Sequence, residues 1–241
     1  MKYFRSVLIT IVFFIFGIGS MFLNFILFPL INIFYKSQKK LEICSDIIHM
    51  LWHLEVKFME LLRLYKIEIK GDLNIKNKVI VSTHPSFVDV LILIGLIPRT
   101  TCFVKKTLTE NFILKNIVNS IFISNDLELE ELKAQTKKML DAGFNVIIFP
   151  MGTRHRKDEH PKIKKGASLV ALNAQKDIVP IKMSTSENFL FINEPFYAVG
   201  NRNVIFEIEQ MKTIELNNFS SESEIIQKRE ITKTIEQSLY K

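Results

Sequence analysis

The segment THPSFVD places His84 five positions before Asp89, directly after the apolar run KVIVS. A carboxylate bound to one imidazole nitrogen fixes the tautomer and stabilises the imidazolium, so the other nitrogen can take a proton from a hydroxyl group. Pro85 suits the first position of a helix, which predicts that His84 is the N-cap with its ring in a crevice. The pair therefore predicts general-base chemistry, although a capping histidine followed by a helix-face aspartate produces the same pattern.

A second polar loop, FPMGTR, follows the apolar run NVII. Gly152 lets the backbone approach a ligand, Thr153 offers a hydroxyl group, and Arg154 carries a planar fork that suits a phosphate or a carboxylate. More basic residues come next, at positions 156, 157, 162, 164 and 165. They are typical of an anion site and equally of a solvated basic loop. Further on, Pro180 within an apolar run predicts a strand edge or bulge that borders the crevice.

Other residues with metal-binding or redox chemistry are less informative. His49 and His53 are spaced to share one helix face, but no third zinc ligand is apparent, so we expect them to serve packing or an interfacial role. Cys44 and Cys102 lie in apolar surroundings without regular spacing, and we expect buried free thiols. The sequence therefore predicts no metal and no cofactor.

The elements that must position these loops alternate between β-rich and helical patterns. Strands are expected at 78–83, 101–104, 120–124, 145–149, 178–183 and 204–208, and helices at 87–96, 127–142, 165–175 and the C-terminus. This alternation predicts an α/β fold, with a mostly parallel sheet flanked by helices. Ligands bind outside the carboxyl ends of the strands in such sheets, where the two polar loops lie.

The N-terminus predicts a membrane anchor. No charged residue occurs from Ser6 to Tyr35, and a helix of that length would extend about 45 Å, beyond the roughly 30 Å hydrocarbon core of a bilayer. Gly17, Gly19 and Pro29 are compatible with one kinked span or with a re-entrant helical hairpin. A cleaved signal peptide is the alternative, but the apolar run is too long and lacks a small-residue cleavage site.

We therefore divide the chain into an anchor at 1–40, an amphipathic interfacial helix at 41–64, and a catalytic domain at 65–241 that ends in a helix. The lysines at positions 36, 39 and 40 outnumber the basic residues before the anchor, which favours an inner-membrane protein with its body in the cytoplasm. The formal net charge of +7 favours anionic membrane lipids as partners. Nucleic acid is not expected, because no nucleic-acid motif is present.

Taken together, the blocks resemble a known family. His84 and Asp89, FPMGTR at 149–154, KKGA at 164–167 and VPI at 179–181 occur in the order and separation of the glycerolipid acyltransferases, most like bacterial 1-acyl-sn-glycerol-3-phosphate acyltransferases. The resemblance covers about residues 65–209 and includes FVKK, which contains Lys105. It implies that His84 is the general base, Asp89 its partner and Arg154 a ligand of the acceptor phosphate. It also implies a thioester of coenzyme A or acyl carrier protein as acyl donor and a lysophospholipid as acceptor.

Two positions depart from the family pattern. The second block usually reads Phe-Ile-Asp-Arg but ends here in Asn125, and the glutamate usual in the third block is Met151. A lost charge-assisted phosphate contact is worth about 1.5 to 3 kcal/mol; Lys105, Lys106 and Arg156 are candidates to replace it. Phosphatidic acid is thus the leading expected product, another lysolipid or aminolipid acceptor is the near alternative, and a non-catalytic lipid-binding module the distant one. A serine hydrolase is disfavoured, since no G-x-S-x-G elbow occurs.

Overall fold

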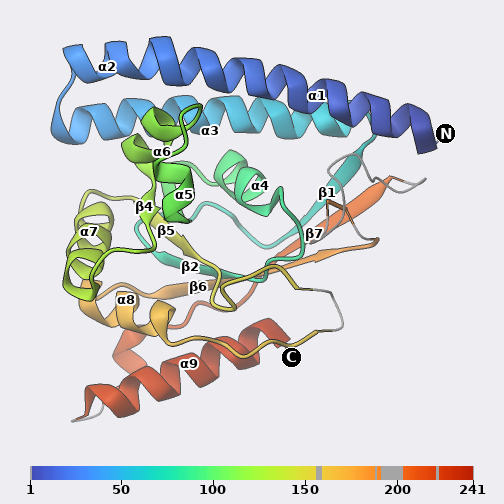
Figure 1. Ribbon diagram of the computed structural model, residues 1–241. Coiled ribbons are helices and arrows are strands. Elements are labelled where there is room, and N and C mark those ends of the chain that lie inside the picture. Colours follow the sequence, from blue (N-terminus) through green and yellow to red (C-terminus); the bar gives the residue numbers. More distant parts are fainter. Residues whose placement is uncertain (1, 156–158, 188, 191–202, 221–222, 241) are drawn as a thin grey trace.

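A mixed sheet lies between two layers of helices in the structure, a computed structural model that describes residues 2–155, 159–187, 189–190, 203–220 and 223–240 (Figure 1). Its described strands are β1 (Tyr65–Lys70), β2 (Val79–Ser82), β3 (Thr100–Val104), β4 (Ile123–Ser124), β5 (Asn145–Ile148), β6 (Ile178–Thr185) and β7 (Val204–Gln210). They are ordered β1-β7-β6-β2-β5-β3-β4. The described pairs are all parallel except β6 with β7, which confirms the predicted fold class.

The central strands β2 and β5 are buried along their whole length, as expected where helices cover both faces of a parallel sheet. In Figure 1, α3 (Ser37–Leu61), α4 (Asp89–Leu96), α5 (Lys106–Thr109) and α6 (Lys115–Ile121) lie on one side of the sheet. On the other side lie α7 (Leu129–Asp141), α8 (Gly166–Ala174) and α9 (Glu224–Tyr240), with a short 3-10 turn at Leu216–Asn218. Each layer supplies one apolar cluster against the sheet.

The strand expected at 120–124 is largely wrong. Residues up to Ile121 belong to α6, and β4 contains only Ile123 and Ser124. A short apolar run cannot be assigned by periodicity alone, and here Ile117 and Ile121 are buried on one helical face. The sequence pattern did not predict β1, in which apolar and charged residues alternate and which pairs with β7.

A long apolar helix precedes the body. It consists of α1 (Lys2–Phe22), a π-helical turn (Leu23–Leu27) and α2 (Phe28–Phe34), and then the chain turns back into α3. The part from Tyr3 to Phe34 is long and apolar enough to cross a membrane. The alternative prediction of a re-entrant turn within this segment is wrong, because the helix runs unbroken through Gly17 and Gly19. The irregularity falls just before Pro29, which lacks the N–H needed for regular helical bonding.

The helix expected at 41–64 is observed as α3, and its two histidines pack against α4. The Nδ1 atoms of His49 and His53 lie 2.7 and 2.9 Å from the backbone oxygens of Ile94 and Gly95. The two helices approach closely, since a Cβ on Gly95 would come within 2.9 Å of the Trp52 backbone. A packing role for both rings is therefore confirmed, and both cysteines are buried free thiols as predicted.

Candidate active site

The loop after β2 is fixed to the neighbouring strand before it reaches the candidate base. The Thr83 hydroxyl donates to the Met183 carbonyl oxygen at 2.7 Å and accepts from the Met183 N–H at 2.6 Å. The loop then runs to Val88, and α4 begins only at Asp89. The prediction that His84 caps a helix starting at Pro85 is therefore wrong. A proline tolerates the first helical turn but does not force a helix to start there.

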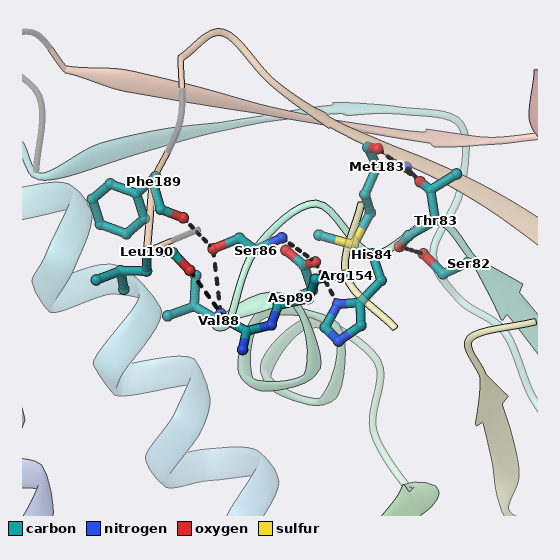
Figure 2. A network of polar contacts seen from close by, with 10 residues as sticks. All are labelled: Ser82, Thr83, His84, Ser86, Val88, Asp89, Arg154, Met183, Phe189 and Leu190. Carbon is teal, nitrogen blue, oxygen red and sulfur yellow. Dashed lines mark hydrogen bonds and ion pairs between the residues drawn. The ribbon is translucent and has the colours of Figure 1, made fainter. Parts of the chain in front are cut away.

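His84 and Asp89 form the predicted pair (Figure 2). Nδ1 of His84 lies 2.8 Å from Oδ2 of Asp89, and the same oxygen accepts the Ser86 N–H at 2.7 Å. The Asp89 side chain is 0% exposed. Burial raises the pKa of Asp89, while the bond from His84, the Ser86 N–H and the Arg154 charge oppose that rise. Because the carboxylate accepts, Nδ1 carries the imidazole proton, and Nε2 is left as a proton acceptor.

The β5 loop supports the histidine from the other side. The His84 ring stacks on Phe149 with centroids 4.1 Å apart. The backbone oxygen of His84 accepts the His155 N–H at 3.1 Å. These contacts join the two loops predicted to form the site, which leave neighbouring parallel strands at the same edge of the sheet.

Gly152 lies in the left-handed region at a φ of 78°, where glycine is favoured. The sequence predicts that a ligand approaches the backbone here. In the structure, the Lys164 side chain lies against it. Its Nζ lies 2.6 Å from where a Cβ on Gly152 would be. The Lys164 N–H also donates to the Pro150 oxygen at 2.9 Å. A basic side chain therefore covers the turn that presents Thr153 and Arg154.

Arg154 lies close enough to the His84–Asp89 pair for its charge to act on Asp89. Its guanidinium lies 5.7 Å from the Phe87 ring centroid, and Nη1 donates to the Leu190 oxygen at 3.4 Å. The side chain is half-buried, so part of the guanidinium is accessible to a ligand. Thr153 and Lys105 are exposed, Lys105 directly after the carboxyl end of β3.

Pro180 does not lie at an edge of the sheet, so the edge alternative of the prediction is wrong. The bulge alternative is not contradicted, because regular pairing with β7 ends at Ile181 and the next bridge joins Ile178 to Ile214 across one extra residue. Pro180 is inside β6, which pairs with β2 and with β7, and its register partner is Val81. Its backbone oxygen accepts the Met211 N–H at 2.9 Å, one residue beyond the last regular pair of β6 with β7. The absent N–H of proline is thus tolerated within the sheet.

Sequence reasoning missed the segment that clamps this site. The backbone oxygen of Phe189 accepts the Ser86 hydroxyl at 2.7 Å (Figure 2). The backbone oxygen of Leu190 accepts the Phe87 N–H at 3.3 Å. Leu190 has a φ of 51°, an unusual conformation for a leucine. Because these contacts use backbone oxygens of two apolar residues, no side-chain pattern could have indicated them.

The two departures from the family pattern have different surroundings. Asn125 is exposed, and the adjacent Asp126 forms an ion pair with Lys106 at 3.2 Å. Met151 is buried in the apolar cluster beneath the sheet, so its side chain does not face the site. Lys106 is therefore engaged, Lys105 is the candidate replacement at this edge, and Arg156 lies outside the described residues.

Comparison with known proteins agrees with this geometry. A family model described as "Acyltransferase" matches residues 66–184. Over 131 residues the chain is 34% identical to a 1-acyl-sn-glycerol-3-phosphate acyltransferase of Chlamydomonas reinhardtii, covering 49% of this chain and 39% of that protein. It is 26% identical over 131 residues to the human 1-acyl-sn-glycerol-3-phosphate acyltransferase beta, covering 51% of this chain and 46% of that one. The chain thus spans less than half the length of these curated relatives.

The fold also matches a solved structure over almost its whole length. The crystal structure of PlsC, the 1-acyl-sn-glycerophosphate acyltransferase from Thermotoga maritima, superimposes with a TM-score of 0.70 at 16% identity. The match covers 98% of this chain and 97% of that one. The shared architecture therefore includes the N-terminal helices as well as the sheet.

Proposed function

Through residues 66–184 the chain belongs to the acyltransferase family, and from this premise we propose that it transfers a fatty acyl group to the free hydroxyl of 1-acylglycerol-3-phosphate. The product is phosphatidic acid, a precursor for phospholipid synthesis. The observation that carries the proposal is the 2.8 Å contact between His84 and the buried Asp89. This contact leaves Nε2 of His84 as the proton acceptor at the carboxyl edge of the sheet.

The proposed reaction uses this pair directly. Nε2 of His84 takes the proton of the acceptor hydroxyl as its oxygen attacks the thioester carbonyl carbon, and Asp89 stabilises the imidazolium that results. The tetrahedral intermediate then collapses, the carbon–sulfur bond breaks, and the departing thiolate takes the proton back from Nε2. An ester and a free thiol are formed, and the imidazole is neutral again. The donor is an acyl thioester of acyl carrier protein or coenzyme A, and the route uses no metal, no cofactor and no covalent enzyme intermediate.

The acceptor phosphate is proposed to bind beside this pair. Arg154 supplies a half-exposed guanidinium that lies over the Phe87 ring, and Thr153, Gly152 and Lys105 complete the proposed rim. The exposed Phe87 beside Arg154 gives the lipid an apolar surface near its charged group. We further propose that the helix from Tyr3 to Phe34 holds the chain in the inner membrane, with the site on the cytoplasmic side.

A second candidate function is acyl transfer to another lysolipid or aminolipid. Asn125 favours it, since the residue at the usual arginine position is uncharged and its neighbour Asp126 pairs with Lys106. A smaller positive charge at the rim would weaken discrimination in favour of a phosphate monoester.

The test offers purified full-length protein a single acyl donor and a set of acceptors: lysophosphatidic acid, two lysophospholipids with larger head groups, and phosphate-free lysolipids. We expect the highest kcat/KM with lysophosphatidic acid. A higher value with another lysolipid would favour the second candidate. Turnover of no acceptor, with either donor thioester, would instead indicate a non-catalytic lipid-binding protein.

A further inference from the structure

An exposed apolar tip lies outside the site, between α5 and α6. We define it as residues 108–113, in which Leu108, Phe112 and Ile113 are solvent-exposed. The Phe112 side chain is 70% exposed. Large apolar side chains grouped at a loop tip are unfavourable in water and mark a surface that contacts another apolar phase.

The tip is fastened to the middle of the long apolar helix by Asn24. This polar residue sits in the π-helical turn and is 0% exposed. Its side-chain nitrogen donates to the Phe112 oxygen at 3.1 Å, and its side-chain oxygen accepts the Asn116 N–H at 2.8 Å. The Asn116 amide in turn donates to the Asn24 backbone oxygen at 2.7 Å. Three hydrogen bonds therefore fix the position of the tip relative to the helix.

This connection makes one apolar surface from two distant segments. The Phe25 and Phe112 rings lie 5.0 Å apart. In Figure 1, the chain around α6 reaches the two long helices, one formed by α1 and α2 and the other by α3. On the helix, Phe22, Phe25 and Ile26 are also exposed. The tip thus continues the face of the segment long enough to cross a membrane.

The charges beside the tip suit an anionic lipid surface. The Lys115 ammonium lies 6.0 Å from the Phe112 ring centroid on an exposed side chain, which can keep its charge at the head groups while its stem lies along apolar groups. The nearest acidic side chain on the tip, Glu110, is 3.9 Å from Lys106 and so is partly neutralised. An aromatic and aliphatic tip with an adjacent lysine is typical of an interfacial membrane contact.

We propose that residues 108–113 insert into the acyl layer of the bilayer beside the long helix and form a second membrane contact. The helix packs against the body, so the orientation of the whole chain depends on which of its surfaces enter the bilayer. The tip, held by Asn24, adds a second attachment and thereby sets the orientation of the body on the membrane. This inference rests on the proposed membrane anchoring but does not depend on acyl transfer.

The test uses a single tryptophan as a depth probe in full-length protein reconstituted into vesicles of phosphatidylcholine and phosphatidylglycerol. In a Trp52→Phe background, Phe112→Trp places the probe on the tip. Ile225→Trp is the matched control, because Ile225 is exposed to a similar degree on α9, on the opposite side of the sheet. Emission is compared between vesicles with plain and with acyl-brominated phosphatidylcholine.

We expect brominated lipid to quench the probe at position 112 and to leave the probe at position 225 unchanged. Equal emission at position 112 in both kinds of vesicle would overturn the proposal. So would a blue-shifted emission that bromine does not quench, because it would indicate that another protein surface covers the tip. Quenching is measured without substrate, so an inactive chain that is quenched would refute the proposed function and leave this inference standing. Leu108→Trp provides a second probe if the first variant fails to fold.

Discussion

The loops after β2 and β5 meet at one edge of the sheet but hold their functional side chains very differently. After β2, Asp89 is fully buried and accepts two hydrogen bonds, and Ser86 is tied to the Phe189 oxygen. After β5, Thr153 is exposed, and among the described residues Arg154 is held by one 3.4 Å hydrogen bond and by the face of Phe87. One loop is thus fixed before any ligand arrives, and the other keeps freedom to adjust.

The two loops are therefore expected to determine two different properties, the reaction class and the choice of acceptor. A general base acts only at hydrogen-bonding distance, so its geometry must be fixed in advance by the fold. A head-group rim with solvent access can exchange water for different polar groups, so it tolerates substitution. We therefore expect the His84 pair to define the reaction class strictly, and the proposed rim, altered at Asn125, to define the acceptor more loosely.

The largest expected effect comes from removing the base. His84→Ala should lower kcat by about 10² to 10⁴, because no other group would take the hydroxyl proton. The measurement is steady-state acyl transfer with saturating acceptor, and circular dichroism checks the fold. His160→Ala is the matched control, since that exposed ring contacts Tyr240 rather than the site. Near-normal kcat in His84→Ala would refute the assignment of the base.

In these two loops, the sequence predicts contacts between residues that are close in the chain better than contacts between distant residues. The spacing of His84 and Asp89 is local, so the sequence reveals the pair, and apolar runs before both loops reveal the buried strands. The observed start of α4 is later than predicted, because a proline permits a helix to start at its position without requiring it, and tertiary contacts hold Ser86 and Phe87 in the loop instead. The contacts of Phe189 and Leu190 are not predictable from the sequence, because their backbone oxygens accept hydrogen bonds from groups about a hundred residues away in the chain.

Asp89→Asn should separate the charge of the pair from its geometry. Both hydrogen bonds converge on Oδ2 and Oδ1 has no partner among the described residues, so an amide oxygen can keep both contacts. Loss of a charge-assisted hydrogen bond of about 1.5 to 3 kcal/mol predicts a fall of roughly 10- to 150-fold in kcat. A variant with unchanged kcat would mean that the carboxylate charge does not stabilise the imidazolium.

The same variant should unfold at a higher temperature than the parent at neutral pH. Burial raises the pKa of Asp89 above its ordinary value of 3.8, so the folded chain binds a proton more readily than the unfolded chain. This carboxyl group therefore reduces stability as pH rises from the unfolded pKa through the folded pKa. Asp89→Asn lacks that titration, and we expect its Tm advantage to shrink toward pH 4 and below. Differential scanning calorimetry across pH measures it; a pH-independent difference would contradict the burial argument.

In the loop after β5, Arg154→Ala should act mainly on acceptor binding. The side chain is half-exposed, which places the lost phosphate contact near the lower end of the range, about 1.5 kcal/mol, or roughly tenfold in KM for lysophosphatidic acid. The KM for phosphate-free lysolipids should change little. Arg154→Lys keeps the charge without the planar fork and should recover part of the loss. An effect confined to the acyl donor would contradict the proposed role.

The smallest effect is expected from Ser86→Ala, which loosens the fixed loop without touching its reacting groups. The substitution removes the hydroxyl that donates to the Phe189 oxygen but keeps the backbone N–H that donates to Asp89. A neutral hydrogen bond is worth about 1 kcal/mol, so we expect roughly a fivefold lower kcat with an unchanged acceptor KM. Ser184→Ala, which removes an exposed hydroxyl bonded to Glu207, is the matched control and should retain the parent kcat. If Ser86→Ala raised KM and left kcat unchanged, the β2 loop would bind the acceptor rather than hold the base, and the contrast between the two loops would fail.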